Sequence, residues 1–400
     1  MTSKQAVIVD AVRTPGGKRN GGLGGWHSAD LVAELLAALQ RRNDLDPELV
    51  DDVITGCVSQ VGDQSGNVGR SAVLAARWPE SVPATTVDRQ CGSSQQAAHF
   101  AAQGVIAGAY DVVIAAGVEV MTRTPMGSTA VGGEPFGPRA SERYADRETF
   151  GRPGLVPQGL GAELIAERWG LSRVDLDAYS AMSQTRAARA RDEGRFDREI
   201  IPVESRTWDP EQRAASHHGV TIDSDQGIRP STPETLANLK PSFLPAGRVT
   251  AGNSSQISDG ASAMLIMSEE RAVSLGLTPR ARFHAFALAG DDPVAMLTAP
   301  IPATRKILER SGLTLDDIDL VEINEAFASV VLAWQRETHA DLEKVNVNGG
   351  AIALGHPLGA SGAKLMATLL CELERTGGRY GLQTMCEGGG LANATIIERL

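Results

Sequence analysis

The sequence of 400 residues is poor in cysteine, in aromatic residues and in clustered positive charge. Its four cysteines are too widely spaced for a disulfide framework or a Cys-x-x-Cys metal site; they are Cys57, Cys91, Cys371 and Cys386. The net charge is −11 and lysine and arginine form no cluster, which argues against a nucleic-acid or membrane surface. The longest apolar runs are too short to span a membrane. These absences favour a soluble, reduced protein that is not inserted in a membrane.

Targeting signals are also missing from the sequence as given. Residues 1–5 lead directly into the strand-like run Ala6-Val7-Ile8-Val9, without the layout of a signal peptide. The last three residues, Glu398-Arg399-Leu400, differ from the Ser-Lys-Leu type of peroxisomal address. We therefore expect a cytoplasmic location.

Glycine is abundant, with 43 residues, and aromatic residues make up only 4% of the chain, which indicates close backbone packing and many tight turns. A hydrophobic content of 42% over this length suffices for two or three domains with cores. Buried-strand and helix patterns alternate up to residue 121 and resume at residue 249, whereas polar residues, glycine and proline increase between them. We predict an α/β protein with a first domain of residues 1–121 plus 249–270, an inserted loop domain of residues 122–248, and a second domain of residues 271–400.

The local patterns predict individual elements within this plan. We expect a helix that begins at the N-cap Ser28, and another that begins at Ser172 with Asp175 as its capping-box partner. Strands are predicted where apolar runs are short and uninterrupted, at residues 6–13, 52–57, 111–121, 263–267, 281–288, 318–323 and 394–398. Further helices are predicted at residues 269–275, 303–311 and 363–375.

The chain is organised around Cys91. The β-branched run Thr85-Thr86-Val87 predicts a strand, and the small residues from Ala97 to Ala109 predict a closely packed helix, so Cys91 lies at the turn between them. Unpaired N–H groups and the partial positive charge of a helix N-terminus stabilise a thiolate, and we expect them to lower the pKa of this thiol. The alternative is an inert buried thiol.

A second unit has the same order of elements as the Cys91 unit. It consists of a strand, a turn at His356, a small-residue helix, and a strand that ends at the turn of Cys386 and Gly388. If the two units are related by a pseudo-twofold axis, their turns meet at that axis. The repeat therefore predicts that Cys91, His356 and Cys386 share one pocket.

This combination of residues indicates thiol chemistry. A Cys–His pair alone could belong to a cysteine hydrolase. Cys386, on a turn of three glycines, adds a second thiol, and with a pKa near the ordinary value of about 8.5 it can exchange a proton with a carbon acid or another thiol. The N–H groups of Cys91 and Gly388 can form an oxyanion hole, and Asn324, at a strand end, can hold a water at another.

Metal chemistry has weak support in the sequence. His217 and His218 are adjacent, so their side chains point apart on most backbones, and no carboxylate pattern accompanies them. His27, His99, His284 and His339 stand alone, and we assign them no function. We expect neither a metal ion nor a permanently bound cofactor.

Four motifs, in their order and spacing, resemble the thiolase family of acetyl-CoA acetyltransferases and 3-ketoacyl-CoA thiolases. They are Cys91-Gly-Ser, Asn324-Glu-Ala-Phe, Gly355-His-Pro-Leu-Gly-Ala-Ser-Gly and Cys386-Glu-Gly-Gly-Gly. The resemblance covers essentially the full length, including Arg13-Thr14-Pro15, the segment 229–241 and Thr250–Ser255. It implies two similar α/β domains in a five-layered α-β-α-β-α arrangement, and either thiolytic cleavage of 3-ketoacyl-CoA or the reverse Claisen condensation.

The resemblance also implies a role for each catalytic residue. Cys91 would accept the acyl group, His356 would activate it, and Cys386 would be the acid and base for the enolate carbon and the incoming thiol. Asn324 would hold a water of one oxyanion hole, whereas the N–H groups of Cys91 and Gly388 would form the other. Coenzyme A is then a substrate, with Ser255 near its pantetheine arm and Arg229 near its adenine end.

The sequence departs from the family pattern at three positions. Ser94 stands where glycine is common, Gln158-Gly159 where a Met-Gly pair is frequent, and Gln256 where glycine often follows Ser255. We place Gln158 and Gln256 on the acyl side, and they favour a bulkier or more polar acyl group than acetyl, a steroid-derived thioester being one option.

Two alternatives remain open at this point. A ketoacyl-synthase-like condensing enzyme shares the fold but lacks a second cysteine, so Cys386 argues against it. A non-catalytic acyl-CoA carrier would be expected to have lost Cys91, His356 or Cys386. By analogy with the family we expect a homodimer or homotetramer, a place in fatty acid or other lipid metabolism, and possible β-oxidation partner enzymes.

Overall fold

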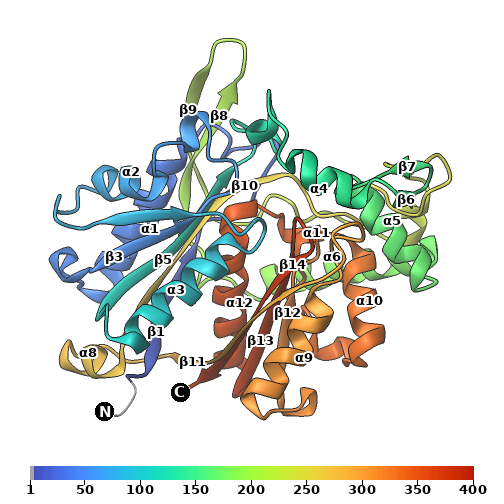
Figure 1. Ribbon diagram of the computed structural model, residues 1–400. Helices are drawn as coiled ribbons and strands as arrows, with labels where there is room; N and C mark the ends of the chain where they lie inside the picture. Colours follow the sequence, from blue (N-terminus) through green and yellow to red (C-terminus); the bar gives the residue numbers. More distant parts are fainter. Residues whose placement is uncertain (1–3) are drawn as a thin grey trace.

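The computed structural model describes residues 4–400 and contains one large mixed sheet that spans both halves of the chain (Figure 1). Its strands are β1 (Ala6–Arg13), β2 (Gly17–Lys18), β3 (Asp52–Gly56), β4 (Ala84–Val87), β5 (Val112–Val120), β10 (Ser258–Ser268), β11 (Ala281–Gly290), β12 (Leu320–Ile323), β13 (Tyr380–Glu387) and β14 (Leu391–Arg399). Two separate hairpins are formed by β6 (Glu148–Thr149) with β7 (Arg152–Pro153), and by β8 (Val203–Asp209) with β9 (Ala214–Ile222).

The helices of residues 4–400 lie on both faces of the large sheet and in the segment inserted between β5 and β10. They are α1 (Ser28–Asn43), α2 (Val68–Ala75), α3 (Ser93–Ala107), α4 (Gly137–Tyr144), α5 (Gln158–Arg168), α6 (Arg173–Asp192), α7 (Pro233–Ala237), α8 (Glu269–Ser274), α9 (Pro300–Ser311), α10 (Ala328–Thr338), α11 (Ala351–Leu354) and α12 (Ser361–Thr376). None of the helices in this described part is both long and apolar enough to cross a membrane.

The two halves of the sheet have the same strand arrangement from the centre outward, and the first half has one additional edge strand, β4. From the centre outward, one half runs β1-β10-β5-β3-β4 and the other β11-β14-β13-β12. The first two pairings in each half are antiparallel and the next is parallel, so each half repeats the other. The halves are joined by a short antiparallel pairing of β1 with β11, through Val7 and Ile8.

Alternation of side chains along the strands produces five layers. Ala6 and Ile8 of β1 face α3 and α12, which contact one another between the two halves of the sheet. Val7 and Val9 face the outer layer of α1 and α2, and α9 and α10 cover the outer face of the other half. Since side chains in a strand alternate with a period of two, the apolar strands can be buried on both faces. The predicted five-layered α/β architecture is confirmed.

The repeat predicted from the sequence is present, with one exception. α3 and α12 are the matching central helices, and β5 and β13 are the strands that follow them. The strand expected before His356 is absent: Val345 makes a single parallel bridge to Val321, and the short helix α11 follows. The glycines at 349 and 350 explain the difference, since Gly349 has φ +75° and a Cβ there would meet Ser183 O at 2.6 Å.

The excursion from Thr122 to Arg248 contributes no strand to the large sheet. Its ends are close together, because β5 pairs with β10 along nearly its whole length. Buried Arg13 of β1 ties the excursion to the sheet through ion pairs to Glu199 (2.6 Å) and Asp225 (2.7 Å). The β8–β9 hairpin projects from the top of the molecule in Figure 1.

The N-caps of α6 and α1 can be compared with those predicted from the sequence. The capping box of Ser172 and Asp175 at α6 is confirmed. The N-cap of α1 is wrong by one residue: Ser28 is the first helical residue, and the Nδ1 atom of His27 accepts the hydrogen bond from the N–H of Ala29. An imidazole nitrogen can therefore replace the hydroxyl or carboxylate oxygen that usually caps a helix.

Candidate active site

Cys91 is a buried residue on the turn between β4 and α3. The residue before it, Gln90, has φ +49°, a left-handed conformation that side-chain-bearing residues adopt infrequently. Ser93 holds this conformation, since its hydroxyl donates to Gln90 O at 2.6 Å. Gly92 is required for space, because a Cβ there would lie 1.9 Å from Oε1 of Glu387. The backbone thus turns sharply at the cysteine and lies directly against β13.

His356 is oriented by Ser361. The Ser361 hydroxyl donates to Pro357 O (2.8 Å), so its oxygen accepts from Nδ1–H of His356 (2.6 Å). This assignment leaves Nε2 without a proton. Burial lowers the pKa of His356 to about 3, with a smaller contribution from Lys364. The imidazole is therefore neutral at physiological pH and can accept a proton at Nε2.

Asn324 lies beside the histidine at the end of β12. Its Nδ2 is 3.4 Å from Nε2 of His356, and its backbone N–H donates to Thr384 O on β13. The side chain is buried and its Oδ1 has no hydrogen-bond partner among the described residues. The strand end expected from the sequence thus brings the amide next to the base.

The turns of the two halves pack directly on one another. The N–H of Ala363 donates to the hydroxyl of Ser94 at 2.9 Å, and a Cβ on Gly362 would lie 2.2 Å from the backbone nitrogen of Gln95. On the other side, a Cβ on Gly388 would lie 2.8 Å from Oε1 of Gln90. Ser94, one of the departures from the family pattern, therefore links the halves. The cavity that Cys91 lines is also lined by Leu358 of the histidine turn and by Gly388 of the Cys386 turn, so the three turns meet there. His356 and Cys386 do not line it themselves, and a single pocket shared by the three reactive side chains stays a prediction.

Cys91 and Cys386 both have higher pKa values than the sequence suggests. Burial raises the pKa of Cys91 well above its usual value, and Cys386 and Glu387 add to the effect. The prediction of a lowered pKa at the helix N-terminus is wrong, because desolvation outweighs the helix end. Burial raises the pKa of Cys386 to about 12, although a hydrogen bond with Asn324 acts in the opposite direction. Both sulfurs are therefore protonated at rest, so Cys91 depends on a base and Cys386 is ready to act as an acid.

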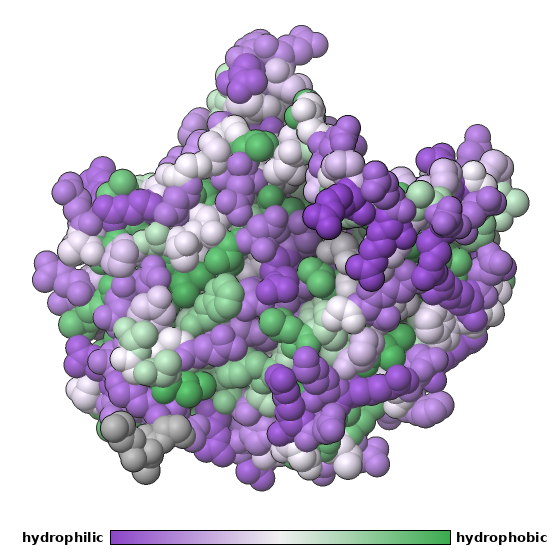
Figure 2. Space-filling model, in the orientation of Figure 1, coloured by the Kyte–Doolittle hydropathy of each residue, from purple (hydrophilic) through white to green (hydrophobic). Residues whose placement is uncertain are grey.

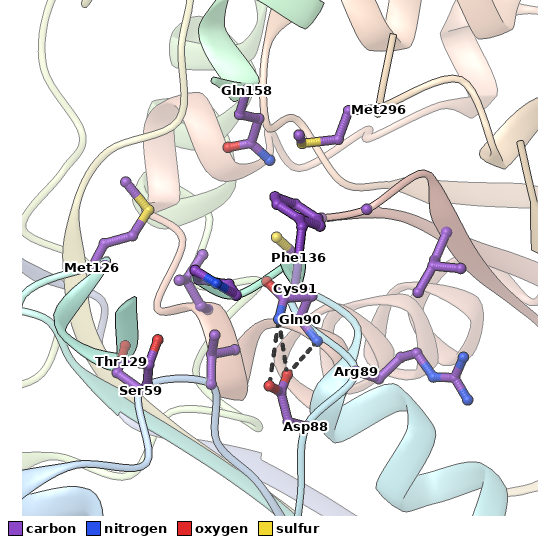
Figure 3. Close-up of a pocket in the computed structure, with 17 residues that line it drawn as sticks. Ser59, Asp88, Arg89, Gln90, Cys91, Met126, Thr129, Phe136, Gln158 and Met296 are labelled. Atoms are coloured by element: carbon purple, nitrogen blue, oxygen red, sulfur yellow. Dashed lines mark hydrogen bonds between the residues drawn. The ribbon is translucent and has the colours of Figure 1, made fainter. Parts of the chain in front are cut away.

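Cys91 lies in a cavity of about 570 Å³, a size typical of small-molecule sites. Figure 3 shows Met126, Phe136, Gln158 and Met296 arranged around it. The remaining lining residues are Val58, Ser59, Asp88, Arg89, Gln90, Gly127, Thr129, Pro135, Leu358, Gly388, Gly389 and Leu391. Most of the wall is apolar, and the charged pair Asp88 and Arg89 lies at one side.

The backbone at Cys91 and Gly388 is available to a ligand. Both residues line the cavity, and neither N–H donates a hydrogen bond to another residue between positions 4 and 400. Such paired donors are the usual components of an oxyanion hole. The geometry is thus compatible with the role expected for these two groups.

The other residues expected to bind substrate fall in different places. Gln158 lines the cavity at the start of α5. Gln256 does not, since its Nε2 donates to the carbonyls of Gly227, Ile352 and Ala353. Its side chain therefore supports the backbone near His356, and its placement on the acyl side is wrong.

Ser255 and Arg229 lie outside the main cavity. The N–H of Ser255 donates to Ala326 O, which places it against the Asn324 turn. Arg229 is exposed and lines a separate cavity of about 450 Å³ against α6, together with Gln184, Thr185, Ala188, Arg191, Ile228, Pro230, Ser231 and Thr232. Contacts of either residue with coenzyme A stay predictions.

The remaining histidines belong to structural contacts. His217 and His218 are exposed on β9, where they contact Glu204 and Thr207. His99 is buried on α3 with Nε2 2.6 Å from the hydroxyl of Thr395. Among residues 4–400, no three His, Cys, Asp or Glu side chains gather as metal ligands would.

Several cavity and orienting residues were missed by sequence reasoning. Ser361 is part of the quoted histidine motif, and its position five residues after His356 would have suggested an orienting role. Met126, Phe136 and Met296 carried no such signal, because apolar residues in irregular segments show no periodicity. Glu387 was read only as a spacer of its motif, although it is fully buried beside Gly92.

Comparisons with known proteins agree with this geometry. The chain matches the family described as thiolase, N-terminal domain, over residues 6–270, and that described as thiolase, C-terminal domain, over residues 277–399. A relative named steroid 3-ketoacyl-CoA thiolase FadA6, from Mycobacterium tuberculosis, is 52% identical over 99% of this chain and 94% of its own length. A 3-ketoacyl-CoA thiolase from Aliivibrio fischeri is 44% identical over 99% of this chain and 100% of its own.

Solved structures show the same relationship. The crystal structure of human mitochondrial 3-ketoacyl-CoA thiolase superposes with a TM-score of 0.86 at 35% identity and full coverage of both chains. The Bacillus anthracis acetyl-CoA acetyltransferase gives a TM-score of 0.86 at 37% identity, covering 100% of this chain and 99% of the other. The chain therefore belongs to the thiolase family, and it is an acyltransferase.

Proposed function

We propose that this thiolase cleaves bulky 3-ketoacyl-CoA thioesters with coenzyme A, using Cys91 as the acyl carrier. The observation that carries the proposal is the meeting of three turns at one cavity, which Cys91, Leu358 and Gly388 line. Behind this wall, Cys386 lies close enough to Cys91 to raise its pKa, and Asn324 contacts both Cys386 and His356. A hydrolase needs no second thiol, and an inert carrier needs no base. The convergence thus favours acyl transfer.

Acylation begins at Cys91. Nε2 of His356 accepts the thiol proton while the sulfur attacks the 3-keto carbon of the substrate. The negative charge that develops on the keto oxygen is stabilised by an oxyanion hole, for which the free N–H groups of Cys91 and Gly388 are available. Because both partners are neutral at rest, the proton moves as the bond forms, and no thiolate is needed beforehand.

Carbon–carbon cleavage follows in the same site. The bond between C2 and C3 breaks, the acyl group stays on Cys91, and the electron pair forms the enolate of acetyl-CoA. Cys386 gives its proton to C2, for which a pKa of about 12 keeps the thiol protonated at rest. Asn324, next to His356, is positioned to hold a water at the enolate oxygen.

Transfer to coenzyme A restores the resting state. The incoming thiol gives its proton to the Cys386 thiolate, and its sulfur attacks the acyl carbon on Cys91. Cys91 leaves and takes back the proton that His356 holds. Each group returns to its starting form, and the products are acetyl-CoA and the shortened acyl-CoA.

The cavity supports an acyl group larger than acetyl. Its volume of about 570 Å³ falls in the range for drug-sized ligands, and its wall is formed largely by flexible or aromatic apolar side chains. Gln158 adds one polar contact that can orient such a group. A relative named as a steroid 3-ketoacyl-CoA thiolase shares 52% of its residues with this chain, which favours a polycyclic substrate.

Coenzyme A would enter along the inserted segment. Ser255 lies against the Asn324 turn, near the expected position of the pantetheine arm, and Arg229 supplies an exposed cation farther away. Residues 122–248 would cover the bound coenzyme A. Substitution of Ser255 by Ala should therefore raise KM for coenzyme A more than for the acyl group.

A homodimer is also part of the proposal. β4 is an edge strand in the described chain, and the apolar side chains of Phe100 and Ile106 on α3 are exposed beside it. Figure 2 shows apolar surface over α3 on the face in view. An unprotected edge next to exposed apolar residues is typical of a protein interface. Sedimentation equilibrium would distinguish a dimer from a tetramer, and a monomer would contradict this part.

The decisive experiment compares thiolysis across acyl groups. We expect kcat/KM to be higher for 3-ketoacyl-CoA esters with polycyclic acyl groups than for acetoacetyl-CoA, measured by release of acetyl-CoA. Gln158→Met should change this ratio while acylation of Cys91, followed by mass spectrometry, persists. If no 3-ketoacyl-CoA is cleaved and Cys91 gains no acyl group in folded protein, the proposal fails.

A further inference from the structure

Glu387 is a buried carboxyl group that the proposed mechanism does not use. It follows Cys386 on β13, its side chain is fully buried, and neither carboxyl oxygen has a hydrogen-bond partner among residues 4–400. No Lys, Arg or His nitrogen of these residues lies within 4.0 Å of it. An ionised carboxylate without donors or a counter-ion is costly in such a place.

The neighbouring amide has a complementary deficiency. Asn393, on β14, donates from Nδ2 to Oε1 of Gln96 at 3.2 Å, while its Oδ1 is buried and has no partner in the described chain. Oδ1 of Asn393 and Oε1 of Glu387 lie beside the same point, since a Cβ on Gly92 would be 3.1 Å from the first and 1.9 Å from the second. Neither oxygen has a donor, and a proton on Glu387 would supply the donor that Oδ1 of Asn393 lacks.

We propose that Glu387 is a positioning residue of the active site: its carboxyl group is protonated and donates to Asn393, which keeps the environment of the two thiols uncharged. This inference rests on the proposed roles of Cys91 and Cys386. A neutral side chain here would let negative charge develop on sulfur, enolate and oxyanion. An ionised one would oppose all three by repulsion.

The charge environment agrees with this assignment. The titratable and charged groups that face Glu387 are Cys386 on its own strand, and Asp88, Arg89 and Cys91 on the turn before α3. Burial raises the pKa of Glu387 to about 9, although Arg89 acts against it. Ionised Glu387 in turn raises the pKa of both Cys91 and Cys386. The carboxyl group should therefore stay neutral at physiological pH and lose its proton only near pH 9.

The first test observes the proton directly. We expect the infrared difference between wild-type protein and Glu387→Gln at pH 7 to contain the carbonyl band of a protonated carboxylic acid, and this band should disappear from the wild type as the pH rises past about 9. If the difference spectrum at pH 7 contains carboxylate bands instead, the proposal is overturned. This measurement needs no turnover, so it is independent of whether the protein cleaves 3-ketoacyl-CoA.

The second test measures the effect on the thiols. Alkylation of Cys91 by iodoacetamide, followed by peptide mass spectrometry, should proceed equally at pH 7 in wild type and Glu387→Gln. At pH 10 it should be about threefold to tenfold faster in the variant, because only the wild type carries the extra charge. The exposed Glu309→Gln serves as matched control and should follow the wild type at both pH values.

A structural role alone would predict a different pattern. If Glu387→Gln changes the alkylation rate by the same factor at pH 7 and pH 10, or not at all at pH 10, Glu387 does not set the charge of the site. If the variant does not fold, the carboxylic acid band is titrated in wild type carrying isotope-labelled glutamate, and the absence of a carboxylic acid band at pH 7 overturns the proposal.

Discussion

A buried carboxyl group lies on the strand that follows the central helix in each half, Glu119 on β5 and Glu387 on β13, and the two groups differ in their hydrogen bonds. Glu119 of β5 accepts four hydrogen bonds, from the N–H groups of Val58, Ser59 and Gly359 and from the amide of Gln64. Glu387, on the matching strand β13, accepts none from the described residues. Burial raises the pKa of both groups; four hydrogen-bond donors oppose it at Glu119, whereas Arg89 and a weaker contribution from the backbone of Asn393 oppose it at Glu387.

The comparison separates two uses of a buried acid. Glu119 is a structural junction, since one of its donors, Gly359, belongs to the histidine turn of the other half. Glu387 borders the thiols and holds nothing together by hydrogen bonds as a carboxylate. Burial by itself therefore does not determine the charge of a carboxyl group. The number of donors aimed at its oxygens decides between an anion and a neutral acid.

The largest expected effect tests the division of chemistry between the halves. Cys91→Ala, in the first half, should lower thiolysis by about 10⁵-fold or more and abolish acylation, because the nucleophile is lost. Cys386→Ala, in the second half, should still acylate at Cys91 but lose about 10²- to 10⁴-fold in carbon–carbon cleavage. Mass spectrometry and acetyl-CoA release measure the two steps. Cys371→Ala, a buried cysteine of α12, is the control, and full turnover of Cys386→Ala would contradict the assignment.

The next effect tests the packing of the two turns. Gly362→Ala should destabilise the protein by about 3 kcal/mol, because the new Cβ would lie 2.2 Å from the backbone nitrogen of Gln95. Thermal unfolding measures the change. Gly133→Ala, in open space and without a positive φ, should change stability by less than about 0.5 kcal/mol. Equal melting temperatures for the two variants would show that the turns do not pack as described.

A smaller effect tests the carboxyl pair itself. Glu119→Gln should destabilise by about 1–3 kcal/mol, because an amide NH₂ then faces an N–H donor. Glu387→Gln should stabilise at pH 7 by about 2–3 kcal/mol. The sign follows from the raised pKa: Glu387 favours folding fully below about pH 4.5, and its contribution is lost as the pH rises towards about 9.

Urea unfolding at pH 5, 7 and 9 measures this pair. The gain from Glu387→Gln should increase with pH over this range, since the wild type loses stability and the variant does not. The loss from Glu119→Gln should be present at all three pH values. A Glu387→Gln variant that is destabilised at pH 9 would show that the two carboxyl groups are equivalent after all.

The smallest effect concerns the base and the nucleophile, one from each half. His356 has a pKa of about 3, so it stays neutral and available across the physiological range. Acylation of Cys91 should therefore change by less than about threefold between pH 5 and pH 8. Pre-steady-state acylation with an acyl-CoA measures this rate. A rate that falls with an apparent pKa near 6.5 would show that the histidine is solvated rather than buried.

Much of the fold was predictable because its signals are local. Uninterrupted apolar runs such as residues 111–121 identify strands buried on both faces, and the capping box of Ser172 and Asp175 identifies a helix start. The strand before His356 was predicted and does not form, since Gly349 and Gly350 lie against α6 and Glu325. That contact comes from a distant part of the chain, and no local pattern reveals it.

The site was predictable in its reactive groups but not in their surroundings. Cys91, His356, Cys386 and Asn324 lie in quoted motifs at turns, where function concentrates. Gln256 was assigned to the acyl side because it departs from the family pattern at the position after Ser255, yet its amide donates to three backbone carbonyls. Direction of a side chain in a loop depends on which polar groups lie near it in space.

The sequence by itself determined the order of elements, the repeat and the identity of the reactive groups, because periodicity, turn residues and motif spacing are properties of neighbours along the chain. Only the tertiary structure decided the states of charge. It leaves both thiols protonated and His356 neutral, and it gives Glu119 four hydrogen-bond donors but leaves the carboxyl oxygens of Glu387 without a partner in the described chain. Desolvation and hydrogen bonding depend on which distant segments close around a group, and the order of residues along the chain contains no direct record of that enclosure.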